Sequence, residues 1–249
     1  MLDTGSLPRY RTGMSDLYLI RHGQASFGKD NYDRLSPLGI RQARILGEHL
    51  VSISLRFDAA YCGTMDRQLA TAREAFGCYT NAGVSVPDLV QLEGLNEYDT
   101  TAVVSAQVPD MMAADPTLQD DLDKMYTDKE SFKRIFEGAM LRWVSGNHDN
   151  AGSENWTQFT SRVSAALQNI MKRHGRGAAV AVFTSGGPIC AALKWVLNLT
   201  GERAIRLNWQ VVNTSYSRFM YNDERITLAG FNSISHLELY NDRSLITYR

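Results

Sequence analysis

The sequence has almost no excess of charge of one sign. Its 249 residues include 26 Lys and Arg against 27 Asp and Glu, which gives a net charge of −1. Proteins that bind nucleic acid or an anionic membrane surface usually carry a basic patch. Hydrophobic runs are also short, and none approaches the ~20 residues that a membrane-spanning helix requires. We therefore predict neither a nucleic-acid partner nor a membrane-bound protein.

Cysteine is scarce as well. The three cysteines, Cys62, Cys78 and Cys190, are odd in number and have no CxxC spacing. This usage is typical of a reduced cytoplasmic protein with neither a zinc site nor a disulfide framework, and we predict no metal and no cofactor. Residues 1–13 lack the apolar segment of a secretory signal. We predict that they form a disordered N-terminal extension.

What the sequence does contain is short apolar stretches that lead directly into polar or glycine-rich turns. Leu17–Ile20 leads into Arg21–Gly23, and Ala178–Phe183 leads into Thr184–Pro188. Both stretches are typical of buried strands in an α/β protein. Ligands of open α/β sheets bind beyond the carboxyl ends of the strands. We therefore expect both turns to lie at a binding site, where backbone N–H groups at a helix N-terminus favour an anion.

Further strands and helices follow from the same kind of pattern. Ser36 and Pro37 are strong signals for a helix start, and Phe57–Cys62 is typical of a second strand. The next helix places Arg67 in its first turn, where the helix dipole disfavours a cation unless an anion binds there. Gln210–Tyr221 and Ile226–Phe231 are interpreted as two further β segments.

Several of these residues together resemble the histidine phosphatase superfamily, in its phosphoglycerate mutase-like branch. The matching residues are Arg21-His22-Gly23, Leu35–Gly39 with Gln42-Ala43, and Arg67 with Thr71 and Ala72. The resemblance covers most of residues 16–240. It implies a three-layer α/β/α sandwich with a mostly parallel central sheet, a single domain over residues 14–249, and a helical lid insertion at residues 100–150.

The resemblance also implies roles for individual residues. His22 corresponds to the nucleophile that becomes phosphorylated, and Glu97, within Leu95-Asn96-Glu97, to the proton donor. Glu93 is a competitor for that second role, since other branches carry a Leu-x-Glu there. The residues implied to bind the phosphate are Arg21, Gly23, Arg67, Ser185 and Gly186.

Ser185 marks the main departure from the family pattern. The family has Ser-His-Gly-Gly at this point, and its His is the second catalytic histidine, whereas this chain has Ser185 in that place. A hydroxyl still donates a hydrogen bond to phosphate, but a positive charge is lost. His236 lies where related phosphatases also have a His. Gly152-Ser153-Glu154 and Arg162 loosely match the family's Gly-Glu-Ser and a later Arg.

The function that these residues indicate is a metal-independent phosphohydrolase. It would act on a small-molecule phosphate ester, a small phosphorylated metabolite, through a phosphohistidine. One alternative is phosphoryl transfer of the phosphoglycerate mutase type, in which the phosphohistidine is kept from water. The other is a phospho-ligand-binding protein with weak or vestigial catalysis, which the Ser185 replacement favours.

Overall fold

The computed structural model describes residues 13–26, 33–149 and 153–248. A six-stranded sheet lies at its centre, in the order β3-β2-β4-β1-β5-β6. The first four strands of that order pair in parallel, while β5 and β6 are antiparallel. The strands are β1 (Ser15–Arg21), β2 (Ala59–Cys62), β3 (Leu89–Gln91), β4 (Ala179–Thr184), β5 (Tyr216–Tyr221) and β6 (Ile226–Ser233).

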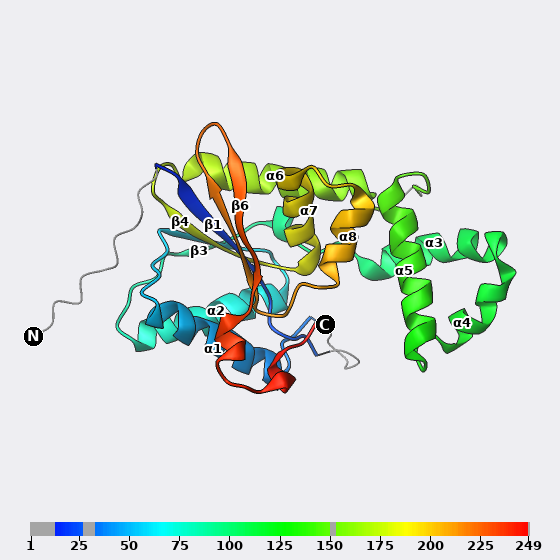
Figure 1. Cartoon of the computed structure of the whole chain (residues 1–249), viewed down its shortest axis with the longest axis horizontal. Helices are drawn as coiled ribbons and strands as arrows, with labels where there is room; N and C mark the ends of the chain where they lie inside the picture. The colour runs from blue at the N-terminus through cyan, green and yellow to red at the C-terminus, as the bar shows by residue number, and fades with distance from the viewer. Residues whose placement is uncertain (1–12, 27–32, 150–152, 249) are drawn as a thin grey trace, which may run out of the picture.

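Helices cover both faces of the sheet (Figure 1). The helices are α1 (Pro37–Ser52), α2 (Asp66–Asn81), α3 (Thr100–Ala114), α4 (Gln119–Lys124), α5 (Lys129–Ser145), α6 (Trp156–Arg173), α7 (Gly186–Leu197), α8 (Gly201–Asn208) and α9 (Ser235–Glu238). Helices α1 and α2 lie on one face, and α6 and α7 on the other (Figure 1). The predicted three-layer α/β/α arrangement with a mostly parallel sheet is confirmed.

Alternating residues of β1 enter two different hydrophobic cores, as expected for a strand with period two. Leu17 and Leu19 pack with residues of α6 and α7. Tyr18 and Ile20 pack with residues of α1 and α2. Burial on both faces explains why the strand is a continuous apolar run in the sequence. It also fixes the position of the residues that follow Ile20.

Residues 100–149 form the group of α3, α4 and α5, which lies at one end of the molecule (green in Figure 1). Helix α5 is amphipathic, and its buried residues include Ile135 and Trp143. In α3 the apolar residues are spread around the helix, so no apolar stripe marks this helix in the sequence. None of the helices within the described ranges is both long and apolar enough to cross a membrane.

One sequence-based prediction of a β segment is wrong. Gln210–Tyr221 is not one β segment, because β5 begins at Tyr216 and residues 210–215 form turns. Thr214 has a left-handed backbone there, with φ of 60°. The N-terminal extension predicted at residues 1–13 lies outside the described residues except for Gly13. That the rest of the chain, residues 14–249, forms one domain stays a prediction.

Candidate active site

The two turns predicted to form a binding edge lie side by side. Strands β1 and β4 pair in parallel, with Arg21 opposite Thr184, and the His22 N–H donates to the Thr184 carbonyl (2.9 Å). A cavity of about 630 Å³ opens beside them. The cavity is lined by Arg21, His22, Arg67, Glu97, Tyr98, Thr100, Lys129, Phe132, Lys133, Phe136, Glu137, Arg206, Asn208, Trp209, Gln210 and Tyr248.

His22 is held in one tautomer by its neighbours. Arg67 Nε donates to His22 Nε2 at 3.1 Å, and because a guanidinium has no acceptor, this ring nitrogen carries no proton. The other ring nitrogen, Nδ1, therefore carries the proton and donates to the Gly23 carbonyl at 2.7 Å. Burial, together with the nearby Arg67 and Arg21, holds the pKa of His22 well below its usual value. The imidazole is thus neutral, with the lone pair of Nε2 available.

Two guanidinium groups lie beside this imidazole. The Arg21 Nη atoms donate to the carbonyls of Val211 and Tyr248, the latter at 2.8 Å. Arg67 is almost fully buried, and its Nη1 forms an ion pair with Asp33 at 2.6 Å. Paired guanidinium groups suit the oxygens of a phosphoryl group, because each presents several N–H donors in a fixed plane.

Arg67 uses different nitrogen atoms for its two contacts, Nε for His22 and Nη1 for Asp33. A lysine keeps the charge but has one nitrogen, so it cannot make both contacts at this spacing. We expect Arg67→Lys to lower kcat/KM for phosphate esters about 10-fold and Arg67→Ala about 100-fold, since a charged hydrogen bond contributes roughly 1.5–3 kcal/mol. Steady-state kinetics of both variants checks this. A wild-type kcat/KM for both variants would show that Arg67 does not bind the phosphoryl group.

Glu97 and Glu93 occupy different environments. Glu93 is exposed in the 3-10 helix η1 (Glu93–Leu95), whereas Glu97 lines the cavity. The Glu97 carboxylate accepts hydrogen bonds from the N–H groups of Gly187 (3.1 Å) and Tyr98 (3.3 Å). Burial raises the pKa of Glu97, although the Gly187 N–H and the two arginines oppose the rise. This placement favours Glu97 over Glu93 as the proton donor.

Gly187 is required for this arrangement. A Cβ atom on Gly187 would lie 1.9 Å from Glu97 Oε1, so any side chain there would displace the carboxylate. Gly187 belongs to the first turn of α7, and its N–H is one of those left without a helical partner. The glycine-rich turn after β4 therefore holds a carboxylate, a contact that the sequence did not predict.

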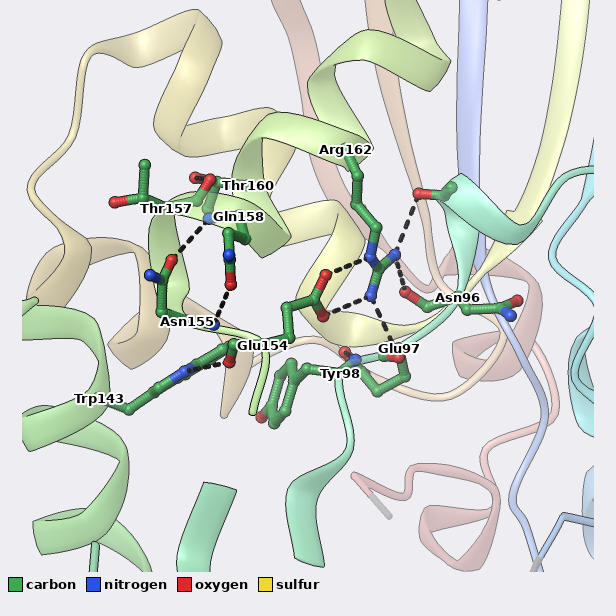
Figure 2. A network of polar contacts seen from close by, with 11 residues as sticks. Asn96, Glu97, Tyr98, Trp143, Glu154, Asn155, Thr157, Gln158, Thr160 and Arg162 are labelled. Carbon is green, nitrogen blue, oxygen red and sulfur yellow. Dashed lines mark hydrogen bonds and ion pairs between the residues drawn. The ribbon is translucent and has the colours of Figure 1, made fainter. Parts of the chain in front are cut away.

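Arg162 of α6 fixes the loop that carries Glu97 (Figure 2). Its guanidinium forms two hydrogen bonds with the Glu154 carboxylate, at 2.6 and 2.9 Å. It also donates to the carbonyls of Gly94 (3.3 Å), Asn96 (2.9 Å) and Glu97 (3.5 Å). Glu154 and Arg162 belong to the segment that loosely matched the family's Gly-Glu-Ser and Arg. Arg162 therefore positions the backbone on either side of the candidate acid.

We expect Arg162→Lys to act through Glu97. An ammonium group cannot bridge three carbonyls and a carboxylate, and small displacements of a catalytic group lower rates substantially. Turnover of alkyl phosphates should fall about 10-fold, and that of activated aryl phosphates much less, because aryl leaving groups need little protonation. Arg44→Lys, at an exposed ion pair with Glu74, is the matched control. Equal losses for both kinds of ester would show that Arg162 merely stabilises the fold.

Ser185 lies at the N-cap position of α7, but its side chain makes no capping hydrogen bond. It is fully buried, and Ser185 Oγ accepts a hydrogen bond from Gln68 Nε2 at 2.8 Å. Within the described chain, Ser185, Gly186 and Gly23 are not among the residues that line the cavity. The Gly23 N–H donates to Thr71 Oγ1 at 3.0 Å. Phosphate binding by these three residues stays a prediction.

Ser185→Ala separates two roles of this hydroxyl. If Ser185 binds phosphate, the variant loses about 0.5–1.5 kcal/mol of affinity for inorganic phosphate. The contact with Gln68 adds a second expectation, because the buried amide loses an acceptor and the free energy of unfolding falls by about 1–3 kcal/mol. Phosphate titration and thermal unfolding of the same variant measure both quantities. A less stable variant with unchanged phosphate affinity would leave Ser185 with a structural role alone.

His236 does not extend to the cavity. It is buried in α9, where His236 Nε2 lies 3.2 Å from Thr214 Oγ1, and burial lowers its pKa to about 3. The turn before β5 supports the site instead, since Asn213 Nδ2 donates to the His22 carbonyl at 3.0 Å. The two residues are 191 positions apart in the sequence, so no local pattern predicts this contact.

The family model of the histidine phosphatase superfamily (branch 1) matches residues 17–234. Comparison with curated protein sequences gave no match. Among the described residues, no cluster of three His, Cys, Asp or Glu side chains forms a metal site.

Similar solved structures cover nearly the whole chain at low sequence identity. One is a phosphoserine phosphatase from Entamoeba histolytica in complex with 3-phosphoglyceric acid, at 21% identity over 90% of this chain and 100% of that chain, with a TM-score of 0.60. Another is Bacillus stearothermophilus YhfR, at 18% identity over 90% and 99%, with a TM-score of 0.64. A third is a phosphoglycerate mutase from Bacillus anthracis str. Sterne, at 17% identity over 93% and 99%, with a TM-score of 0.61.

These likenesses support the fold, while the family model covers most of the chain and includes the strand that ends at Arg21 and His22. With the sheet order, the paired turns and the family match in agreement, the chain belongs to the histidine phosphatase superfamily, whose members are phosphatases or mutases.

Proposed function

We propose that the protein is a metal-independent phosphohydrolase that acts on small phosphorylated metabolites through a phosphohistidine on His22. The observation that carries the proposal is the state of the imidazole: Nδ1–H is held by the Gly23 carbonyl, and the unprotonated Nε2 lies beside Arg67. An imidazole fixed in this way is a ready nucleophile. A cytoplasmic location is part of the same proposal, supported by the low cysteine content.

In the first step, His22 Nε2 attacks the phosphorus atom of the ester. A bond forms between Nε2 and phosphorus as the bond from phosphorus to the leaving oxygen breaks. Arg21 and Arg67 stabilise the negative charge on the phosphoryl oxygens, which is the main demand of phosphoryl transfer. Protonated Glu97 gives its proton to the leaving oxygen, so the product departs as a neutral alcohol.

In the second step, water attacks the phosphohistidine. Glu97, now a carboxylate, takes a proton from the water as the new oxygen–phosphorus bond forms. The bond between phosphorus and Nε2 breaks, inorganic phosphate is released, and His22 returns to its neutral form. Glu97 ends the cycle protonated, ready for another ester.

Access of water favours hydrolysis over a mutase reaction. A mutase must keep water from its phosphohistidine until the phosphoryl group returns to an acceptor. Here several residues that line the cavity are themselves exposed to solvent, among them Lys129, Lys133 and Tyr248. Release of inorganic phosphate and transfer between positions of phosphoglycerate, measured side by side, separate the two reactions.

A binding protein with weak catalysis is the second candidate, favoured by Ser185 in place of the family's second His. A phosphate binder needs neither a neutral nucleophile nor a protonated acid beside it. A screen of phosphorylated metabolites with wild-type protein and His22→Ala in parallel tests the choice. Turnover that depends on His22 supports the hydrolase, whereas binding without turnover of any ester supports the binder.

A further inference from the structure

The cavity extends well beyond the residues of the proposed chemistry. At 630 Å³ it lies in the range of pockets that enclose a drug-sized ligand, much more than a phosphate group fills. Its outer part is lined by residues of α5 and by the end of α8 with the turn that follows it. If the phosphoryl group of a substrate lies beside His22, its leaving group would extend toward these outer residues.

The outer cavity is lined by three cationic side chains, Lys129, Lys133 and Arg206. Lys129 and Lys133 both line it, and neither forms an ion pair with a carboxylate in the part of the chain that the structure describes. Arg206, on the α8 side, differs, because it pairs with Glu137 and Glu202, each at 3.1 Å. Among the described residues of the outer cavity, the two lysines are thus cations that form no ion pair with a carboxylate.

Their position on α5 is unfavourable for the helix itself. Lys129 is the first residue of α5, where the helix dipole disfavours a cation. Lys133 lies four residues later, so the two ammonium groups project from neighbouring positions, and like charges at this spacing destabilise a helix. An anion with two or three oxygen atoms, such as a carboxylate or a second phosphate, would relieve both effects by bridging the pair.

Aromatic rings form the remaining wall of the outer cavity. Phe132 and Phe136 lie on the same face of α5 as the lysines, with ring centroids 5.4 Å apart and an interplanar angle of 11°. The Trp209 ring follows α8, with the Arg206 guanidinium 6.0 Å from its centroid. Flat aromatic faces bind flat apolar groups well. The outer cavity thus combines an aromatic surface with two adjacent cations.

We propose that the substrates are phosphomonoesters whose leaving group carries a flat aromatic ring and a second anionic group. The ring would lie against Phe132, Phe136 and Trp209, and the anion would bind Lys129 and Lys133. This inference rests on the proposed phosphohydrolase function and specifies its substrate class.

The test uses esters of primary alcohols, so that the leaving groups differ little in reactivity. The probes are glycerol 3-phosphate, benzyl phosphate, 4-carboxybenzyl phosphate and 4-(carboxymethyl)benzyl phosphate. We expect kcat/KM to be higher for benzyl phosphate than for glycerol 3-phosphate. The better of the two carboxylated esters should exceed benzyl phosphate by about 10-fold. Lys129→Gln/Lys133→Gln should remove that last gain and change benzyl phosphate turnover less than about 2-fold.

Matched variants make the result specific. Lys124→Gln/Lys172→Gln removes the same charge from residues that do not line the cavity, and should leave the carboxylate preference intact. Trp209→Leu should lower turnover of the benzyl esters about 5-fold and spare glycerol 3-phosphate. The proposal is overturned if the carboxylated esters show no advantage in the wild type, or if the lysine variant lowers all four esters equally.

Binding of non-hydrolysable benzylphosphonates, with and without the carboxylate, separates this inference from the proposed function. A lysine-dependent preference for the carboxylated phosphonate, without hydrolysis of any ester, would support the inference and reject the hydrolase. Hydrolysis of benzyl phosphate without a carboxylate preference in turnover or binding would support the hydrolase and reject the inferred substrate class. Isothermal calorimetry measures the affinities, and thermal unfolding confirms that the variants are folded.

Discussion

His22→Ala is expected to reduce phosphate release from every substrate to background, a loss on the order of 10⁴-fold or more, as for removal of the nucleophile from other covalent enzymes. The reason is that neither Arg21 nor Arg67 supplies a nucleophile. Hydrolysis would then require direct attack by water on the ester. Phosphate release measured with the preferred ester of the metabolite screen checks this.

The control is a histidine outside the cavity. His49 lies in α1 and is partly exposed, so His49→Ala removes an imidazole without touching the site and should retain wild-type turnover. Thermal unfolding of His22→Ala shows whether the protein still folds. A folded His22→Ala protein with wild-type turnover would contradict the covalent mechanism.

Glu97→Gln is expected to slow alkyl phosphates by about 10²–10⁴-fold, the usual contribution of general acid catalysis. Glutamine keeps the size of the side chain and the contact with the Gly187 N–H, but it carries no transferable proton. Activated aryl phosphates should slow much less in the first step, because their leaving groups depart without protonation. Pre-steady-state release of the alcohol or phenol isolates that step.

The pH dependence gives a second measure of Glu97. Its pKa is raised by burial, and the acid form is needed, so phosphorylation of His22 by alkyl esters should decline as the pH rises through this pKa. Glu97→Gln should lose that alkaline decline. Glu93→Gln is the matched control in the exposed η1 helix. If Glu93→Gln gives the selective loss for alkyl esters instead, the proton donor is Glu93 and not Glu97.

Local sequence patterns predicted the central part of this site well. Continuous apolar runs identified β1 and β4, and the general rule for parallel sheets placed the residues that follow them at one edge. Ser36 is the N-cap of α1, where its side chain accepts from the Gly39 N–H, as its position before Pro37 predicted. These features depend on neighbours along the chain, which the sequence displays directly.

Contacts between distant segments could not be predicted in the same way. Arg162 binds carbonyls more than 60 residues away, and Asn213 binds the His22 carbonyl across 191 residues. The β segment predicted from Gln210 failed for this reason, because a turn that supports His22 replaces its first half. The Gln68 contact with Ser185 and the lysine pair of α5 likewise depend on packing that local pattern does not encode.

The most direct test is to trap the phosphoenzyme. The protein is mixed with a ³²P-labelled ester and denatured within milliseconds, either in alkali or in acid, and the bound label is located by peptide mapping. A phosphohistidine on His22 is stable in alkali and labile in acid, so the label should survive the alkaline quench, map to the peptide that contains His22, and disappear after acid. An active enzyme with no alkali-stable label on that peptide, or with label that survives acid, would contradict a phosphohistidine at His22.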